Sequence, residues 1–351
     1  NYMIGELIGE LTVGHAYINP GEYASAERIQ MGLLGAEITR DPATGFFRIE
    51  KILEGAKWSK SLFSPLTEPG LNVKQGDYIV SIDGVPTNTV NDMYSLLVGK
   101  AGVPTELNIN GKAQLKGARK IVVSPIDSES ALYDYQWVQG NLKKVEEATD
   151  GKVGYIYIPD MGPEGLNEFA KYFYPQLDKE GLIIDDRANG GGNVSPMILE
   201  RLSREPYRLT MGRGTSRVGT IPDAVQVGPK VCLINKYSAS DGDLFPYGFR
   251  ALGLGKLIGT RTWGGIVGIS GSLPFIDGTD MRVPFFTSYS VDGQWIIENR
   301  GVDPDIWIDN DPIKEFRGED EQLNRAIEEV MKELKNRKPL APAPAPRVWN
   351  K

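Results

Sequence analysis

Apolar residues recur along this chain with two different spacings, and each spacing predicts a different kind of structure. Within residues 1–27, Met3, Leu7 and Leu11 lie four residues apart, which is the period of an amphipathic helix. We expect this helix to run toward Gly14 and to place His15 at its C-terminal end. Residues 31–126 instead hold short β-type runs, among them 46–49, 78–82 and 120–123, separated by Gly, Pro and Asn. Such runs predict a small β-rich domain.

The second half of the chain alternates between strand-like and helix-like patterns. Buried strands are predicted at 153–158 and 181–185, around a helix near 165–177. Further strands are predicted at 231–234 and 256–259, with a helix beginning near Asp241 between them and an amphipathic helix at 320–335. This alternation is typical of an α/β sheet. The whole pattern predicts a multidomain protein of the α+β and α/β classes.

Composition narrows the possible partners and cofactors. The chain has 351 residues with a formal net charge of −7, and this acidic balance argues against nucleic acid, whose binding depends on Lys and Arg. No stretch approaches the ~20 apolar residues that cross a bilayer, so no membrane partner is predicted. The single cysteine, Cys232, lies in an apolar run and is interpreted as a core residue, and no metal or organic cofactor is implied.

The first residue and the C-terminal segment also support predictions. Residue 1 is Asn, so we expect a mature or excised piece of a longer protein, and a cytoplasmic and a periplasmic location both stay open. Residues 341–346 alternate Ala and Pro, which suits an extended tail.

Four segments could carry chemistry. His15 is the only histidine, so any histidine chemistry must use it, although a lone histidine is more often structural. A predicted strand runs into Gly190, Gly191 and Gly192, which could form a tight loop or expose N–H groups to an oxyanion. Ser240 follows a strand and precedes a helix, where it could cap the helix or present its hydroxyl as a nucleophile. Glu298 ends an apolar run that we interpret as a strand, and by itself it could be any edge carboxylate.

Together these parts amount to an acyl-transfer site, with a nucleophile, a base, a carboxylate and backbone donors. Their order resembles the C-terminal catalytic half of the tricorn protease and C-terminal processing peptidase family, over nearly all of the chain. The resemblance implies that Ser240 is the nucleophile, His15 the general base and Glu298 the distal carboxylate. It also implies an oxyanion hole formed by the N–H of Asp241 and that of Gly191 or Gly192.

Two positions depart from patterns of that family. One branch carries a lysine base in a Thr-Phe-Gly-Lys-Gly motif, but this chain reads Thr-Trp-Gly-Gly-Ile at 262–266. The missing lysine favours His15 as the base. In tricorn a serine precedes the histidine and links it to the glutamate, whereas Gly14 stands here. Glu298 could then reach His15 directly or through water, or Ser238 could stand in for the serine.

The β-rich insert resembles a PDZ domain, with Gly32, Leu33, Leu34 and Gly35 at the place of the carboxylate-binding loop. Such a domain can bind a peptide as an added strand, or it can be a structural insert that binds nothing. The resemblance implies an N-terminal helical part of the catalytic core at 1–28, the PDZ-like domain at 29–127, a crotonase-like α/β peptidase domain at 128–337 and a tail at 338–351.

The leading functional hypothesis is a serine endopeptidase that cleaves oligopeptides through an acyl-enzyme. The alternative is a weakened or inactive peptide-binding assembly module that keeps the peptidase fold, and a weaker one is an enzyme acting on a different acyl substrate. The resemblance further implies a homo-oligomer and an upstream portion that is missing from this chain.

Overall fold

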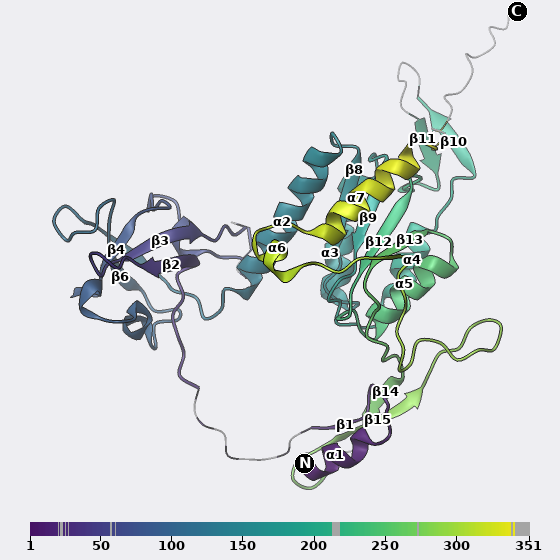
Figure 1. The fold of residues 1–351 in the computed structure, drawn as a ribbon, viewed down its shortest axis with the longest axis horizontal. Helices are drawn as coiled ribbons and strands as arrows, with labels where there is room; N and C mark the ends of the chain where they lie inside the picture. Colours follow the sequence, from purple (N-terminus) through teal and green to yellow (C-terminus); the bar gives the residue numbers. More distant parts are fainter. Residues whose placement is uncertain are drawn as a thin grey trace, which may run out of the picture. The chain divides into compact units, whose positions relative to one another are not determined.

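The computed structural model describes residues 1–337 and 340, apart from residues 20, 22, 23, 25, 27, 57, 60, 213–217, 272 and 273. The predicted tail at 341–346 lies outside the described residues. The chain divides into two compact units (Figure 1). Unit one comprises Asn1–Tyr23 and Asn141–Lys351, and unit two comprises Ala24–Gly140. Unit one is therefore built from two stretches of sequence that unit two separates.

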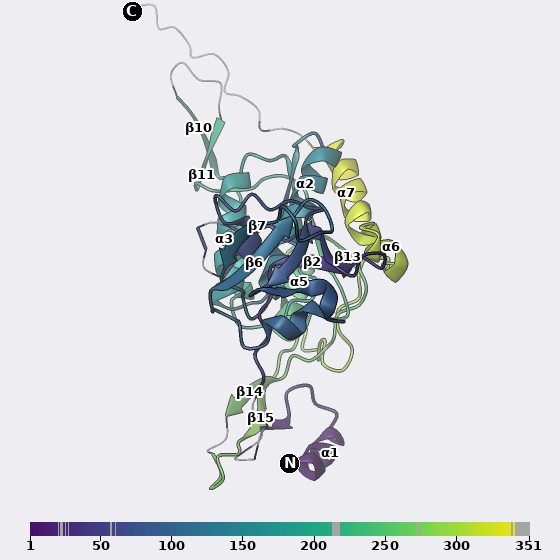
Figure 2. The ribbon, with the colours of Figure 1, turned by 90° about the vertical axis from the view of Figure 1, so that its left-hand side faces the viewer.

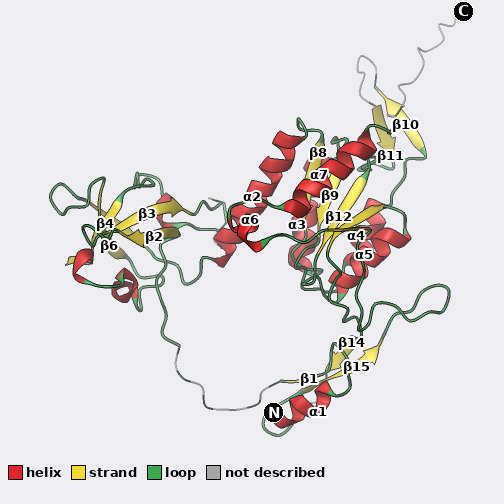
Figure 3. Cartoon of the chain, viewed as in Figure 1, coloured by secondary structure: helices red, strands yellow, loops and turns green. Residues whose placement is uncertain are grey.

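A parallel sheet of five strands forms the centre of unit one, in the order β16-β13-β12-β9-β8. Figure 3 labels three of these strands, β8, β9 and β12. Parallel strands end at a common edge of the sheet, which is where ligands bind in open α/β folds. The turns after β9 and β12 lead to the glycine loop and to Ser240. The five strands are β8 (Val153–Tyr157), β9 (Gly181–Asp185), β12 (Lys230–Ile234), β13 (Gly255–Gly259) and β16 (Ile306–Trp307).

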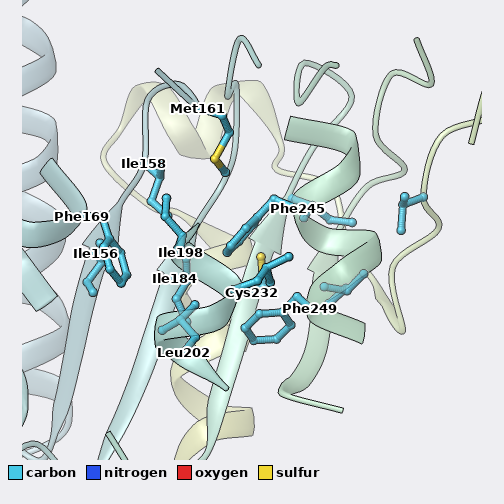
Figure 4. Packing of buried hydrophobic residues seen from close by; sticks show 14 of the residues in the cluster. Ile156, Ile158, Met161, Phe169, Ile184, Ile198, Leu202, Cys232, Phe245 and Phe249 are labelled. Atoms are coloured by element: carbon cyan, nitrogen blue, oxygen red, sulfur yellow. The ribbon is translucent and has the colours of Figure 1, made fainter. Parts of the chain in front are cut away.

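Helices cover both faces of this sheet. On one face, Ile184 and Cys232 pack with Phe169, Ile198 and Phe245 from three helices in one apolar cluster (Figure 4). The three helices are α3 (Pro163–Phe173), which continues into the short 3₁₀ helix η4 (Tyr174–Gln176), α4 (Ser195–Leu202) and α5 (Asp241–Ala251). The other face is covered by α7 (Glu321–Leu334), which contacts β9, β12 and β13. Helix α2 (Ser130–Ala148) begins in unit two and ends in unit one, where Asn141 donates a hydrogen bond to the Tyr155 hydroxyl of β8. Burial on both faces explains why these strands read as continuous apolar runs.

The remaining elements of unit one are small. Strands β1 (Tyr17–Ile18), β14 (Gly268–Gly271) and β15 (Met281–Phe286) form an antiparallel sheet in the order β1-β15-β14. Figures 1 and 2 both place this sheet beside α1 (Tyr2–Gly9). Strands β10 (Arg208–Met211) and β11 (Val218–Ile221) pair as a hairpin, and α6 (Pro312–Phe316) precedes α7. None of the helices within the described ranges has the length and apolar character that crossing a bilayer requires.

Unit two is an antiparallel sheet in the order β2-β3-β4-β6-β7, with β5 paired to β4. Its apolar core includes Leu34, Ile49, Ile79 and Leu107, all fully buried. Strand β2 lies at one edge of the sheet. The strands are β2 (Ala36–Arg40), β3 (Phe47–Ile52), β4 (Tyr78–Ile82), β5 (Val85–Pro86), β6 (Thr105–Asn110) and β7 (Arg119–Val123), and the 3₁₀ helices are η1 (Pro65–Thr67), η2 (Thr87–Thr89) and η3 (Met93–Leu97).

Most of the local predictions are confirmed, but two are wrong where they concern the site. The strands expected at 78–82 and 181–185 are present residue for residue, and Cys232 is fully buried. The N-terminal helix ends at Gly9 and does not reach His15, because no residue of α1 is buried and Thr12 has a left-handed backbone with φ of 52°. Glu298 lies in a turn and not at the end of a strand, since Ile297 and Asn299 both have positive φ.

Candidate active site

Ser240 occupies a sharp turn between β12 and α5. Its φ is 59° and its ψ is −119°, a combination that non-glycine residues rarely adopt. It immediately precedes the helix, but its side chain makes no capping hydrogen bond. Helix capping, the ordinary alternative for this serine, is therefore not its role here. The half-buried Ser240 instead lies at the N-terminal end of α5, where the helix dipole favours negative charge.

The glycine loop packs directly against this turn. A Cβ atom at Gly191 would lie 2.6 Å from Ser240 Cβ and 3.1 Å from the backbone nitrogen of Asp241, so only glycine fits. Gly191 and Gly192 both have positive φ. The Gly191 N–H donates a 2.9 Å hydrogen bond to Asn189 Oδ1. Gly192 is exposed, and its backbone pairs through a parallel bridge with Met161.

Glu298 is held by three backbone amides from two segments. Its Oε2 accepts hydrogen bonds from Ile266 N at 2.7 Å and Val267 N at 2.9 Å, and its Oε1 accepts one from Gly14 N at 2.9 Å. Hydrogen bonds from backbone N–H groups to a carboxylate are charge-assisted and hold the side chain in place. Glu298 thus binds the backbone of the residue before His15 and makes no recorded hydrogen bond to the imidazole within the described residues.

His15 lies in the turn between α1 and β1. Its Nδ1 is buried and has no hydrogen-bond partner among the described residues. The ring stands edge-on to that of Trp263, with centroids 6.4 Å apart and planes at 83°. Gly14 does not have positive φ, but a Cβ there would lie 2.8 Å from Gly265 Cα and 3.3 Å from Glu298 Oε1. Close packing, and not a left-handed backbone, therefore favours glycine at this position.

The segment 262–267 connects these parts. Trp263 N donates to Ser238 O at 2.9 Å, two residues before Ser240, while the Trp263 ring contacts His15. The buried Asp243 accepts hydrogen bonds from Gly264 N at 2.8 Å and Gly265 N at 3.3 Å. Burial raises the pKa of Asp243, and the hydrogen bonds from Thr262 and these amides oppose that rise. This segment thus joins the serine turn, His15 and Glu298.

Two further carboxyl groups support the same turns. Asp241 is buried and accepts hydrogen bonds from the N–H of Ser195, at 2.9 Å, and from its hydroxyl, which ties the start of α5 to the start of α4. Asp186 is fully buried, and neither of its carboxyl oxygens has a hydrogen-bond partner among the described residues. Burial, together with the nearby Asp185, Asp243 and Asp241, raises the pKa of Asp186 well above its ordinary value.

Comparisons with known proteins agree with this arrangement. The family "Tricorn protease PDZ domain" matches residues 32–128, and "Peptidase family S41" matches residues 152–308. The chain contains a tricorn protease PDZ domain and a family S41 peptidase domain. It is 37% identical over 341 residues to the tricorn protease of Thermoplasma volcanium, covering 96% of this chain and 32% of the relative. It is 35% identical to tricorn protease homolog 1 of Streptomyces coelicolor, covering 93% and 30%.

A solved structure of the tricorn protease is similar with a TM-score of 0.85 at 34% identity, covering 93% of this chain and 32% of that one. The chain thus spans about a third of the length of these relatives. The S41 and tricorn similarities support a multidomain α/β fold.

The loop residues predicted for the PDZ domain lie in unit two, before β2. Gly32 N donates to Leu97 O at 2.9 Å, and Leu33 N donates to Ile126 O at 2.7 Å. The Leu34 side chain is fully buried in the core of the domain. Gly35 N donates to the carboxylate of Glu129 at 2.7 Å. The N–H groups of Gly32, Leu33 and Gly35 therefore already have acceptors within this chain.

Sequence reasoning on the S41 domain left out Asp243 and Asp186 and gave Ser238 a role that its contacts do not support. Ser238 Oγ donates to Asp186 O at 2.7 Å, so this hydroxyl is used to join two turns and not to link Glu298 with His15. Asp243 could have been found from its position, because it lies in the first turn of the helix that Ser240 precedes. Nothing in the local sequence marks Asp186, whose properties come from burial.

Proposed function

We propose that this chain is the catalytic part of a serine endopeptidase that cleaves oligopeptides through an acyl-enzyme. In this mechanism Ser240 Oγ attacks the carbonyl carbon of the peptide bond, and His15 takes the hydroxyl proton and passes it to the leaving amine. Water then hydrolyses the ester and regenerates Ser240. The observation that carries the proposal is the backbone of Ser240, at φ 59° and ψ −119°, at a sharp turn directly before Asp241, whose N–H has no acceptor within α5.

The proposed oxyanion hole uses the N–H groups of Asp241 and Gly192. Asp241 is the first residue of α5, so its N–H has no acceptor within the helix. The sequence left Gly191 and Gly192 as alternatives. Because the Gly191 N–H already donates to Asn189 Oδ1, we assign the second donor to Gly192. The role of Gly191 is then to let the loop approach Ser240 closely.

Glu298 acts in this proposal by fixing the backbone next to the base. Its hydrogen bond to Gly14 N positions the residue before His15, and its bonds to Ile266 and Val267 position the segment that contacts the imidazole. This arrangement orients the base without a direct bond to it. Positioned acid-base catalysis contributes roughly 10²–10⁴-fold, so alignment of His15 has a large effect on turnover.

Several broader assignments belong to the same proposal. Of the proposed limits 1–28, 29–127 and 128–337, the first is supported by the division of the chain at residues 23–24 and the second by the PDZ match, which ends at residue 128, while the compact unit extends to residue 140. The crotonase-like class of the peptidase domain is supported by its parallel sheet with helices on both faces. Oligopeptide substrates are proposed because the relatives are proteases. Homo-oligomers and further domains upstream are proposed because these relatives are about three times longer than this chain, which suits one part of a larger assembly.

Labelling with a fluorophosphonate tests the nucleophile. The reagent should modify Ser240, as mapped by mass spectrometry, with loss of labelling in Ser240→Ala and strongly reduced labelling in His15→Ala. Ser128→Ala, which changes an exposed serine, is the control and should label normally. Peptide hydrolysis should disappear in Ser240→Ala. A folded protein that is not labelled would favour the peptide-binding module, and labelling without cleavage of any peptide in a library would favour a different acyl substrate.

A further inference from the structure

The loop before β2 in the PDZ domain already holds a carboxylate from this chain. Glu129 Oε1 accepts hydrogen bonds from Gly35 N at 2.7 Å and from Ala36 N at 3.2 Å. Glu129 is half-buried and directly precedes α2. All three residues belong to unit two, so the contact lies within one compact body.

The backbone of Gly35 makes this convergence of amides possible. Successive N–H groups of an extended strand point to opposite sides, but Gly35 has φ of 71°, and both N–H groups reach one oxygen. Consecutive N–H groups turned to one side form a concave anion site. A side chain at Gly35 is excluded, because its Cβ would lie 2.7 Å from Ser64 Oγ and 3.0 Å from Pro65 Cδ.

The rest of the loop is also engaged within the domain. Leu33 exchanges two backbone hydrogen bonds with Ile126, at 2.7 and 2.9 Å, three residues before Glu129. This pairing brings the segment 126–129 alongside the loop. Burial raises the pKa of Glu129, which shows the cost of desolvating this carboxylate, and the Gly35 and Ala36 amides act in the opposite direction. The amides therefore offset part of the cost of placing an acid here.

We propose that Glu129 is the resident ligand of a carboxylate site formed by the Gly35 and Ala36 amides, and that the C-terminal carboxylate of a peptide binds this site only by displacing it. A terminal carboxylate offers the same two oxygens as the glutamate side chain. The adjacent strand β2 lies at the edge of its sheet, where an extended peptide could add as a further strand. Glu129 then sets a threshold for peptide capture. This inference is independent of the catalytic proposal.

Binding of short peptides to the full chain tests the proposal. Fluorescein-labelled pentapeptides ending in Ala, Val or Phe would be used as free acids and as C-terminal amides, with binding followed by anisotropy. A Ser240→Ala background keeps the probes from being consumed. Removal of a competing charge-assisted carboxylate should tighten binding of at least one acid by about tenfold or more in Glu129→Ala. The amides should bind weakly to every variant.

Controls separate displacement from a general effect of charge or folding. Asp127→Ala removes an exposed acid two residues earlier and should behave as the parent. Glu129→Gln keeps the shape of the side chain, should give intermediate affinity and replaces Glu129→Ala if that variant does not fold. Hydrogen exchange of the Gly35 and Ala36 amides should accelerate when Glu129 is replaced by Ala. The proposal is overturned if parent and Glu129 variants bind the acids equally, if acids and amides bind alike, or if no variant binds any peptide.

Discussion

Glu298 accepts a hydrogen bond from the backbone amide of Gly14, at 2.9 Å, across 284 positions of sequence. The same carboxylate binds the amides of Ile266 and Val267. It thereby fixes the residue before His15 and the segment that carries Trp263, whose ring contacts His15. Because Glu298 contacts the backbone of Gly14, it can affect the imidazole of His15 only indirectly.

Replacement of Glu298 by Gln should lower turnover without abolishing it. The amide has one carbonyl oxygen for three N–H donors, so at least one donor faces an NH₂ group. The loss in kcat should be smaller than the roughly 10⁴-fold loss seen when a carboxylate bonded directly to a catalytic imidazole is replaced. Steady-state kinetics and thermal melts would measure both effects, with the exposed Glu319→Gln as control. A loss equal to that of Ser240→Ala would show that Glu298 acts on the reacting groups themselves.

Gly14→Ser should raise turnover by a few-fold and lower stability. A Cβ at this position would lie 3.3 Å from Glu298 Oε1, so the serine hydroxyl could donate to that oxygen and orient His15, whose Nδ1 has no partner among the described residues. The Cβ would also lie 2.8 Å from Gly265 Cα, and overpacking of this kind typically costs about 1–3 kcal/mol.

The control for this prediction is Gly14→Ala, which adds the same Cβ without the hydroxyl. It should lose stability to a similar degree and gain no activity. If the serine variant folds and is no faster than the alanine variant, the missing hydroxyl does not limit catalysis in this protein.

Asp243→Asn should reduce kcat more than it changes KM. The Asp243 carboxylate holds the amides of Gly264 and Gly265, beside the Trp263 ring that contacts His15. The carboxamide leaves one of these buried donors facing its NH₂ group, which costs about 1–3 kcal/mol. Kinetic measurements at a temperature where melts show both proteins folded would check the split. An unchanged kcat in a destabilised variant would assign Asp243 to stability alone.

Asp186→Asn should alter how stability depends on pH. The pKa of Asp186 is raised well above the ordinary 3.8, mainly by burial, so the unfolded chain releases this proton at a lower pH than the folded protein does. The free energy of unfolding therefore falls as pH rises from about 4 toward the raised pKa, with a slope of at most about 1.4 kcal/mol per pH unit for one group. The neutral Asn removes that contribution.

Urea unfolding between pH 5 and 8, followed by circular dichroism, would measure this difference. The variant should become more stable relative to the parent as pH increases. Asp134→Asn, at an exposed position on α2, should show no such trend. A difference between parent and Asp186→Asn that stays constant with pH would contradict a buried group that is protonated in the fold.

The sequence by itself determined the elements whose pattern is local. Strand β9 and strand β4 were predicted residue for residue, because a buried strand is a short apolar run bounded by turn residues. The position of Ser240 between a strand and a helix was also predictable. The order of the motifs indicated the resemblance to the tricorn protease and C-terminal processing peptidase family, which the comparisons confirm.

Only the tertiary structure decided those features of the site that depend on contacts between residues far apart in the sequence. Apolar periodicity predicted a helix that reaches His15, but α1 ends at Gly9, and Thr12, with φ of 52°, breaks the helical backbone before His15. Glu298 lies in a turn whose Asn299 N–H donates to Gly264 O, a pairing that no local pattern encodes. The raised pKa of Asp186 and the amides around Glu129 likewise arise from segments far apart in sequence. Their energies depend on packing and desolvation, and these exist only once the chain has folded.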